Sequence, residues 1–159
     1  MSSNTQATLE LTLLTHWIGG KPYQGPVDTW GDVFNPATGE SNTRVAFATP
    51  DIVDVAVKAA AAAQKKWGAA SLAQRARVMF AYRQLLEKHK VEMAEMVTRE
   101  HGKVAADALG EVSRGIEVVE FACGLPQLLK GEFSENVSTD VDSYSIRQPL
   151  GVVAGQGLL

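Results

Sequence analysis

The spacing of hydrophobic and polar residues changes twice along the chain and divides it into three blocks. Short stretches of alternating polar and apolar residues between about 15 and 48 predict β-strands. From 49 to about 131 the apolar residues recur every three or four positions, which predicts helices. From about 137 onward the alternation returns. The pattern therefore predicts an α/β protein with a helical segment between two β-rich segments.

Turn residues separate the candidate strands of the first block. Gly19 and Gly20 predict a two-residue hairpin turn between strands at 16–18 and 21–23. The sequence Asn-Pro-Ala-Thr-Gly at 35–39 predicts a turn between strands at 32–34 and 44–48. The block also contains four aromatic side chains that could form a small cluster: Trp17, Tyr23, Trp30 and Phe34.

The second block contains four predicted helices. Thr49 is a predicted N-cap, and Ser71 and Gln74 have the spacing of a capping box. We expect the third helix to end at Gly102 and Pro126 to end or kink the fourth. The apolar stripe of the first helix is Ile52, Val55, Ala56, Ala59, Ala63 and Trp67, and that of the fourth is Ala108, Val112, Ile116, Val119 and Cys123.

The third block contains two different extended patterns. Polar and apolar residues alternate over 142–148, which predicts an exposed strand suited to pairing with another subunit. Residues 150–155 are then mostly apolar on both faces, as at the start of a buried parallel strand. A parallel strand needs a neighbour that is reached through a crossover of a dozen or more residues, and only four residues follow.

Composition narrows the function classes. The chain has 159 residues, a formal net charge of −3 and one cysteine. The negative charge argues against nucleic-acid binding, and a single cysteine excludes an intramolecular disulfide. No apolar run is long enough to span a bilayer, and no basic residue precedes the short apolar stretch near the amino end. These features predict a soluble protein of a reducing compartment, the cytoplasm.

Most candidate catalytic or binding residues have a simpler structural interpretation. Cys123 lies on an apolar stripe and is predicted to be a buried structural thiol. The three histidines lack the spacing of a helical metal pair. The glycines at 151, 155 and 157 lack the following helix and acidic residue of a dinucleotide-binding loop. We therefore expect no metal site and no nucleotide binding by this chain alone.

Arg114 has two interpretations. It lies on the face of the fourth helix opposite the apolar stripe, so it could be a solvent-exposed arginine paired with Glu111 or Glu117. Alternatively, its guanidinium group could bind a substrate carboxylate in a bidentate manner. Spacing alone favours the first interpretation.

Several motifs resemble the aldehyde dehydrogenase superfamily. They are Trp-Ile-Gly-Gly-Lys at 17–21 and Asp-Val-Phe-Asn-Pro-Ala-Thr-Gly-Glu at 32–40. Three further stretches resemble the CoA-acylating methylmalonate-semialdehyde dehydrogenases. They are Glu-His-Gly-Lys at 100–103, Arg-Gly-Ile-Glu-Val-Val-Glu-Phe at 114–121, and residues 144–155. The resemblance covers about 16–155 and ends before the family's Pro-Phe-Asn-Phe-Pro stretch.

The resemblance implies a reaction that needs more than this chain. Family members oxidise methylmalonate or malonate semialdehyde with NAD and coenzyme A, in valine or inositol breakdown, to propanoyl-CoA or acetyl-CoA. They are about three times longer, and no residue here matches their catalytic cysteine. Arg114 matches the arginine associated with the substrate carboxylate. We therefore expect a truncated, inactive fragment that binds no cofactor alone, from an enzyme that forms homo-oligomers.

The resemblance also predicts how the chain is divided. Residues 1–14 are a flexible tail, 15–136 the N-terminal part of the NAD-binding domain, 137–149 an oligomerisation strand, and 150–159 the start of a Rossmann strand. The expected fold is thus a β-hairpin, a four-helix layer, the oligomerisation strand and the beginning of a parallel sheet. Two alternatives stay open: an aldehyde dehydrogenase that does not use CoA, and a stand-alone helical interaction protein.

Overall fold

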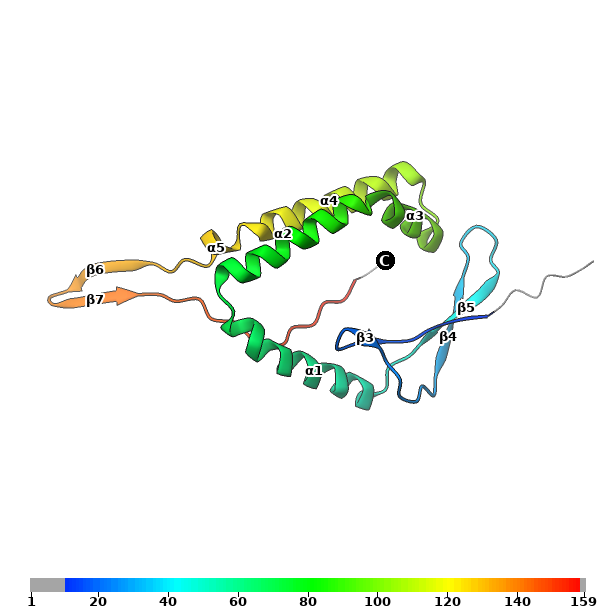
Figure 1. Cartoon of the computed structure of the whole chain (residues 1–159), viewed down its shortest axis with the longest axis horizontal. Coiled ribbons are helices and arrows are strands. Elements are labelled where there is room, and N and C mark those ends of the chain that lie inside the picture. The colour runs from blue at the N-terminus through cyan, green and yellow to red at the C-terminus, as the bar shows by residue number, and fades with distance from the viewer. Residues whose placement is uncertain (1–10, 158–159) are drawn as a thin grey trace, which may run out of the picture. The chain divides into compact units, whose positions relative to one another are not determined.

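The computed structural model describes residues 11–157. These residues form two compact units. One contains the described residues up to Ala60 together with Arg99–Gly102, and the other contains Ala61–Thr98 and the described residues from Lys103 onward. Strands β1–β5 lie in the first unit, whereas helices α2, α4 and α5 and strands β6 and β7 lie in the second (Figure 1).

The first unit contains a three-stranded sheet with β5 (Ser41–Ala46) at its centre. β4 (Trp30–Phe34) pairs with it in antiparallel orientation and β1 (Thr12–Leu14) in parallel orientation. The predicted strands at 32–34 and 44–48 are therefore present with shifted ends. Within the flexible tail expected at 1–14, residues 12–14 form β1, in which Thr12 pairs with Thr43 of β5; residues 1–10 lie outside the described part.

The Asn-Pro-Ala-Thr-Gly turn joins β4 to β5 through local hydrogen bonds. The Ala37 amide donates to Asn35 Oδ1 over 2.9 Å, and the Gly39 amide donates to the Asn35 carbonyl over 2.8 Å. Gly39 has φ of +74°, a conformation that glycine adopts without strain from a Cβ atom. Beyond the turn, Arg44 Nε donates to Asp32 Oδ1 over 2.8 Å and links the paired strands.

The predicted glycine hairpin is confirmed. β2 (Trp17–Ile18) and β3 (Lys21–Pro22) pair in antiparallel orientation around Gly19 and Gly20, which both have positive φ. The aromatic cluster is not formed: Trp17 and Phe34 are 70% and 60% exposed. Among the described residues the aromatic ring contact is instead between His16 and Tyr23, whose centroids are 6.0 Å apart.

Four long helices follow, as predicted, and their caps are at the expected residues. α1 (Pro50–Ala69) begins after Thr49, whose hydroxyl accepts the Ile52 amide over 3.4 Å. α2 (Leu72–Lys88) begins with a complete capping box between Ser71 and Gln74. α3 (Lys90–His101) ends before Gly102, and α4 (Ala105–Cys123) ends before the short helix α5 (Leu125–Leu128), which carries Pro126.

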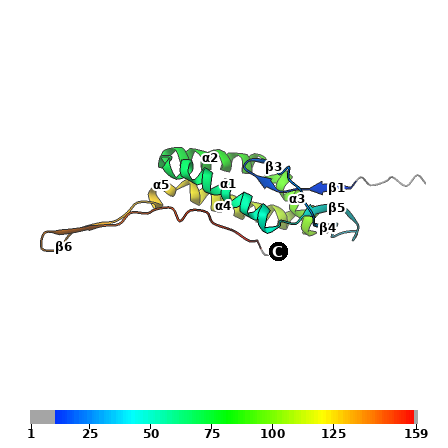
Figure 2. The same cartoon turned by 90° about the horizontal axis from the view of Figure 1, so that it is seen from below.

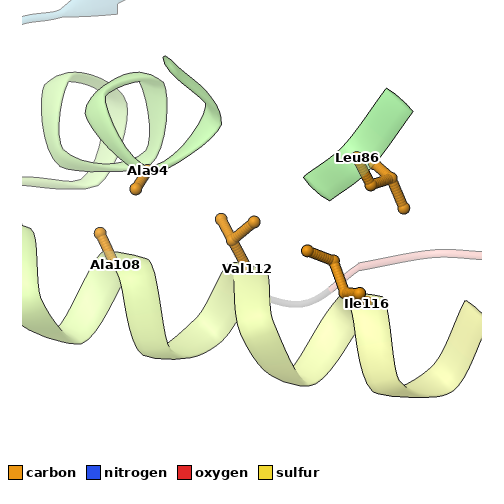
Figure 3. Close-up of a cluster of buried hydrophobic side chains, with 5 residues drawn as sticks. All are labelled: Leu86, Ala94, Ala108, Val112 and Ile116. Carbon is orange, nitrogen blue, oxygen red and sulfur yellow. The ribbon is translucent and has the colours of Figure 1, made fainter. Parts of the chain in front are cut away.

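The core of the second unit lies between α2, α3 and α4. Its buried members are Leu86, Ala94, Ala108, Val112 and Ile116. Figure 3 shows Ala108 of α4 facing Ala94 of α3, while Val112 and Ile116 lie on the side toward Leu86 of α2. The predicted stripe of α4 is thus largely buried, because its alanines and branched residues recur on one helical face. The predicted stripe of α1 is not, since only Ile52 of that stripe is buried and Trp67 is 45% exposed.

After α5 the chain forms a two-stranded antiparallel hairpin that the sequence pattern predicted only in part. β6 (Phe133–Ser138) pairs with β7 (Val141–Tyr144), and every residue of both strands is exposed. The hairpin projects beyond α5 in both views (Figure 1, Figure 2). The predicted strand at 142–148 is therefore shorter and has a partner within the chain, and the boundary expected at 137 falls inside β6.

The segment expected to begin a parallel strand has no regular structure. Residues 150–157 are exposed, with Leu150 at 96% and Val153 at 75%. A strand is stabilised by hydrogen bonds to a neighbouring strand, and no described strand pairs with this segment. Its apolar composition therefore does not by itself produce a sheet. Residues 158–159 of the expected strand lie outside the described part.

Candidate functional site

Arg114 lies in a polar hollow on α4, on the face opposite the core. Ala108, Val112 and Ile116 of the same helix are buried, whereas Arg114 is exposed. The hollow has a volume of about 280 Å³. We call it the α4 hollow, and its lining residues are Lys103, Ala106, Asp107, Gly110, Glu111 and Arg114. The sequence prediction that placed Arg114 away from the core is confirmed.

The ion pairs of the α4 hollow differ from the simplest expectation. Glu111 pairs with Lys103, and both side chains are partly buried, with 39% and 29% of their surface exposed. Neither Glu111 nor Glu117 forms an ion pair with Arg114, and Arg114 has none with any residue of 11–157. The expected pairing of Arg114 along its own helix is therefore wrong, because Lys103 reaches Glu111 from the segment before α4.

The guanidinium group of Arg114 lies close to Gly110. The two residues are one helical turn apart, so they lie on the same face of α4. A Cβ atom built on Gly110 would lie 3.9 Å from Arg114 Nη1. The guanidinium group therefore lies over the glycine, where longer side chains would compete for the same space.

Lys103, Ala106 and Gly110 of the α4 hollow were not identified from the sequence. Lys103 and Gly110 had no predicted role, although Lys103, Asp107, Glu111 and Arg114 follow one another at four- and three-residue spacing. That spacing is the signal that could have shown that they share a face of one helix. It was obscured because Lys103 stands before the first helical residue, Ala105.

A second hollow, between α2 and α4, contains the only cysteine of the chain. Its lining residues are Phe80, Arg83, Gln84, Glu120 and Cys123. Cys123 is only 8% exposed, which confirms the prediction of a buried thiol. Beside it, Arg83 Nη2 lies 2.6 Å from Glu120 Oε1 and joins the two helices. The hydrogen bond to the Glu120 carboxylate raises the pKa of the Arg83 guanidinium. This ion pair therefore stabilises the packing of α2 against α4.

The histidines and the last glycines were the other candidates for a metal or nucleotide site. In the part of the chain that the structure describes, no group of three His, Cys, Asp or Glu side chains could hold a metal ion. Gly151 has φ of +108°, and residues 150–157 form neither a helix nor a strand. Within residues 11–157, no helix has the length and hydrophobicity needed to cross a membrane.

Comparisons of the sequence with known proteins give the same family over most of the chain. The profile of the aldehyde dehydrogenase family matches residues 24–155. Malonate-semialdehyde dehydrogenase 1 of Geobacillus kaustophilus is 46% identical, and malonate-semialdehyde dehydrogenase of Bacillus subtilis is 42% identical. Each alignment covers 146 residues, which is 92% of this chain and 30% of the relative. The chain thus spans less than a third of the length of these relatives.

Solved structures also match most of this chain. A methylmalonate-semialdehyde dehydrogenase of Oceanimonas doudoroffii matches 88% of this chain with a TM-score of 0.83 and 44% identity. A Sinorhizobium meliloti protein named as a methylmalonate-semialdehyde dehydrogenase and solved with NAD matches 89% with a TM-score of 0.84 and 46% identity. These matches cover 28% and 29% of the two solved chains. The α/β fold expected from the sequence, that of the N-terminal part of an aldehyde dehydrogenase, is confirmed, and the chain belongs to the aldehyde dehydrogenase family.

Proposed function

We propose that this chain serves as the N-terminal part of an enzyme that oxidises malonate or methylmalonate semialdehyde with NAD and coenzyme A. The names of the similar proteins support the substrate class. The use of coenzyme A, with propanoyl-CoA or acetyl-CoA as product, rests on the resemblance of the stretch at 114–121 to the acylating subfamily. Both substrates are aldehydes that also carry a carboxylate, and this second group distinguishes them from neutral aldehydes.

The observation that carries the proposal is an exposed arginine with no ion-pair partner among the described residues. Arg114 is held over Gly110 in the α4 hollow, and its guanidinium group is available to an anion from solution. Guanidinium binds carboxylate through two parallel hydrogen bonds. A charge-assisted pair of this kind contributes about 1.5–3 kcal/mol. We propose that Arg114 binds the carboxylate of the semialdehyde in the whole enzyme.

The chain's own residues supply recognition in this proposal, and the bond-making chemistry lies elsewhere. The family's reaction begins with attack of a cysteine thiolate on the aldehyde. Cys123 is buried beside Arg83 and Glu120 on the core side of α4, so it is not assigned that role. NAD, when bound, accepts the hydride, and we assign no residue of 11–157 to it. We therefore propose that the chain on its own oxidises no aldehyde.

The exposed apolar surface of the second unit supports a place inside a larger assembly. Val118 and Phe121 on α4 are each 69% exposed, and Phe133 and Tyr144 on the β6–β7 hairpin are 66% and 75% exposed. Large apolar side chains that are exposed on a helix or a hairpin commonly mark surfaces that bind another domain or subunit. We propose that the hairpin contributes to the contact between subunits of a homo-oligomer in the cytoplasm.

A hybrid enzyme tests the proposal. The hybrid has this chain in place of the matching 30% of the Geobacillus kaustophilus relative, and the chain alone is assayed beside it. We expect the hybrid to form NADH from malonate semialdehyde with stoichiometric acyl-CoA, and the chain alone to form none. Free acid as the product, with or without coenzyme A, would favour an aldehyde dehydrogenase that does not use CoA. NADH formation by the pure chain would contradict the proposal that the chain on its own oxidises no aldehyde.

The arginine is tested in the same hybrid. Replacing Arg114 by Leu removes the cation and keeps a side chain of moderate size, whereas Arg114→Lys keeps the charge without the fork. We expect Arg114→Leu to lower kcat/KM for malonate semialdehyde by roughly 10- to 150-fold, which corresponds to the loss of a charge-assisted pair. The value for propanal should change by less than about twofold. Equal losses for both aldehydes would refute the carboxylate role.

A further inference from the structure

We infer that Lys103 is a positioning residue, which keeps Arg114 available for the substrate carboxylate by pairing with Glu111. The inference rests on the proposed function of Arg114 and assigns a new role to the lysine before α4. Lys103, Glu111 and Arg114 line the same hollow, and Lys103 pairs with Glu111, the glutamate of the hollow that lies three positions before Arg114. Lys103 thereby acts through other residues and is not itself a catalytic residue.

The first step of the argument concerns helix geometry. Glu111 precedes Arg114 by three positions on α4, a spacing at which opposite charges on a helix normally attract. An arginine occupied by its own glutamate would have to break that pair before it could bind a carboxylate from solution. The structure nevertheless contains no ion pair between the two side chains.

The second step concerns what holds Glu111. Lys103 donates to Glu111 Oε1 across eight positions of the chain, so the lysine reaches the glutamate from outside the helix. Both side chains are partly buried, which lowers the screening of their interaction by water and ions. The pair leaves Arg114 to extend over Gly110, which offers no side chain to block it.

The third step is the charge balance of the α4 hollow. Its four charged side chains are Lys103 and Arg114, which are positive, and Asp107 and Glu111, which are negative. With Lys103 present the hollow is formally neutral, whereas without it the hollow carries one negative charge. A negatively charged aldehyde would then meet repulsion at the place where Arg114 is meant to bind it. A neutral aldehyde would be indifferent to this change.

The test uses charge-removing and charge-keeping variants in the hybrid enzyme. We expect Lys103→Gln to raise the KM for malonate semialdehyde about fivefold, the size typical of one exposed ion pair, with kcat and the KM for propanal unchanged. Lys103→Arg should behave as the unsubstituted protein. The double variant Lys103→Gln/Glu111→Gln should recover most of the KM, because the glutamate that captures Arg114 is then neutral.

A spectroscopic measurement on the full 159-residue chain accompanies the kinetics. The side-chain Nε–H signal of Arg114, recorded by 15N NMR, should shift in Lys103→Gln as Arg114 pairs with Glu111. It should return to its original position in the double variant. An unmoved signal in Lys103→Gln, or a KM that the double variant fails to recover, would overturn the inference.

The two proposals fail in different ways. If Arg114→Leu raises the KM for the acidic aldehyde while Lys103→Gln has no effect, the role of Arg114 stands and that of Lys103 is overturned. If Arg114→Leu itself leaves that KM unchanged, the carboxylate role of Arg114 is wrong, and the positioning role of Lys103 falls with it. Equal effects of Lys103→Gln on acidic and neutral aldehydes would indicate a general structural role and would also overturn the inference.

Discussion

Ile116 is the residue whose truncation should destabilise the second unit most clearly. It is 4% exposed and lies in the cluster between α2 and α4 with Leu86 and Val112 (Figure 3). Ile116→Ala removes three carbon atoms from this site. At about 0.8 kcal/mol for each buried methylene group, the loss of burial alone is about 2.4 kcal/mol.

The neighbours of Ile116 decide how much the cavity adds. Leu86 and Val112 are each 9% exposed, so the cluster lies close to the surface and can relax or admit water. We therefore expect a total near the low end of the range for such truncations, about 2.5–3 kcal/mol. Because native domains are only marginally stable, a loss of this size should lower the urea midpoint markedly.

The assay is urea-induced unfolding of the full chain, followed by the helical circular dichroism signal at about 222 nm. Ile116→Val, with an expected cost of about 1 kcal/mol, keeps the test informative if the alanine variant does not fold. Val118→Ala on the same helix is the control, since Val118 is 69% exposed and should cost less than about 0.5 kcal/mol. Equal costs for Ile116→Val and Val118→Ala would refute the assignment of the core face of α4.

Three further predictions concern local backbone and cap geometry. Ser71→Ala removes the hydroxyl that accepts the Gln74 amide and should cost about 1 kcal/mol in urea unfolding, whereas Ser71→Thr should cost much less; no difference between them would argue against the cap. Gly39→Ala forces a Cβ atom into a backbone with φ of +74° and should cost about 1–2 kcal/mol, measured as a lowered thermal midpoint of the hybrid; an unchanged midpoint would contradict the turn geometry. In Gly110→Ala the new Cβ atom meets Arg114 Nη1 only at ordinary contact distance. The gain in helix propensity should therefore stabilise α4 by about 1 kcal/mol, with the KM for malonate semialdehyde unchanged. A destabilised protein would contradict the space found above Gly110.

Features that depend on neighbouring residues were predicted well from the sequence. The capping box at Ser71, the turn at Gly19 and Gly20 and the ends of the helices at Gly102 and Pro126 are each set by residues within one turn of one another. The buried face of α4 was also predicted, because its apolar residues recur with helical period.

Features that depend on distant partners were predicted poorly. β1 and β6 were missed because a strand of three to six residues becomes stable only by pairing, and the partner of Thr12 is Thr43. The apolar stripe of α1 was predicted from its period, and in the structure it is mostly exposed, with Trp67 at 45%. Periodicity identifies an apolar face and does not identify what packs against it.

The α4 hollow illustrates the same limit at the level of single side chains. Arg114 was identified through a family resemblance, and its expected pairing with Glu111 or Glu117 was wrong; Glu111 pairs instead with a lysine that stands outside the helix. Helical spacing compares residues of one helix with each other, whereas Lys103 precedes α4. Ion pairs between a helix and its flanking segment therefore need coordinates.

The central claim is that this chain supplies the group that recognises an acidic aldehyde, and one ratio tests it most directly. That ratio is kcat/KM for malonate semialdehyde divided by kcat/KM for propanal, measured in the hybrid enzyme with Arg114 and with Arg114→Leu. The account predicts that the ratio falls by at least about tenfold in the variant. A ratio that stays the same in both proteins would contradict it.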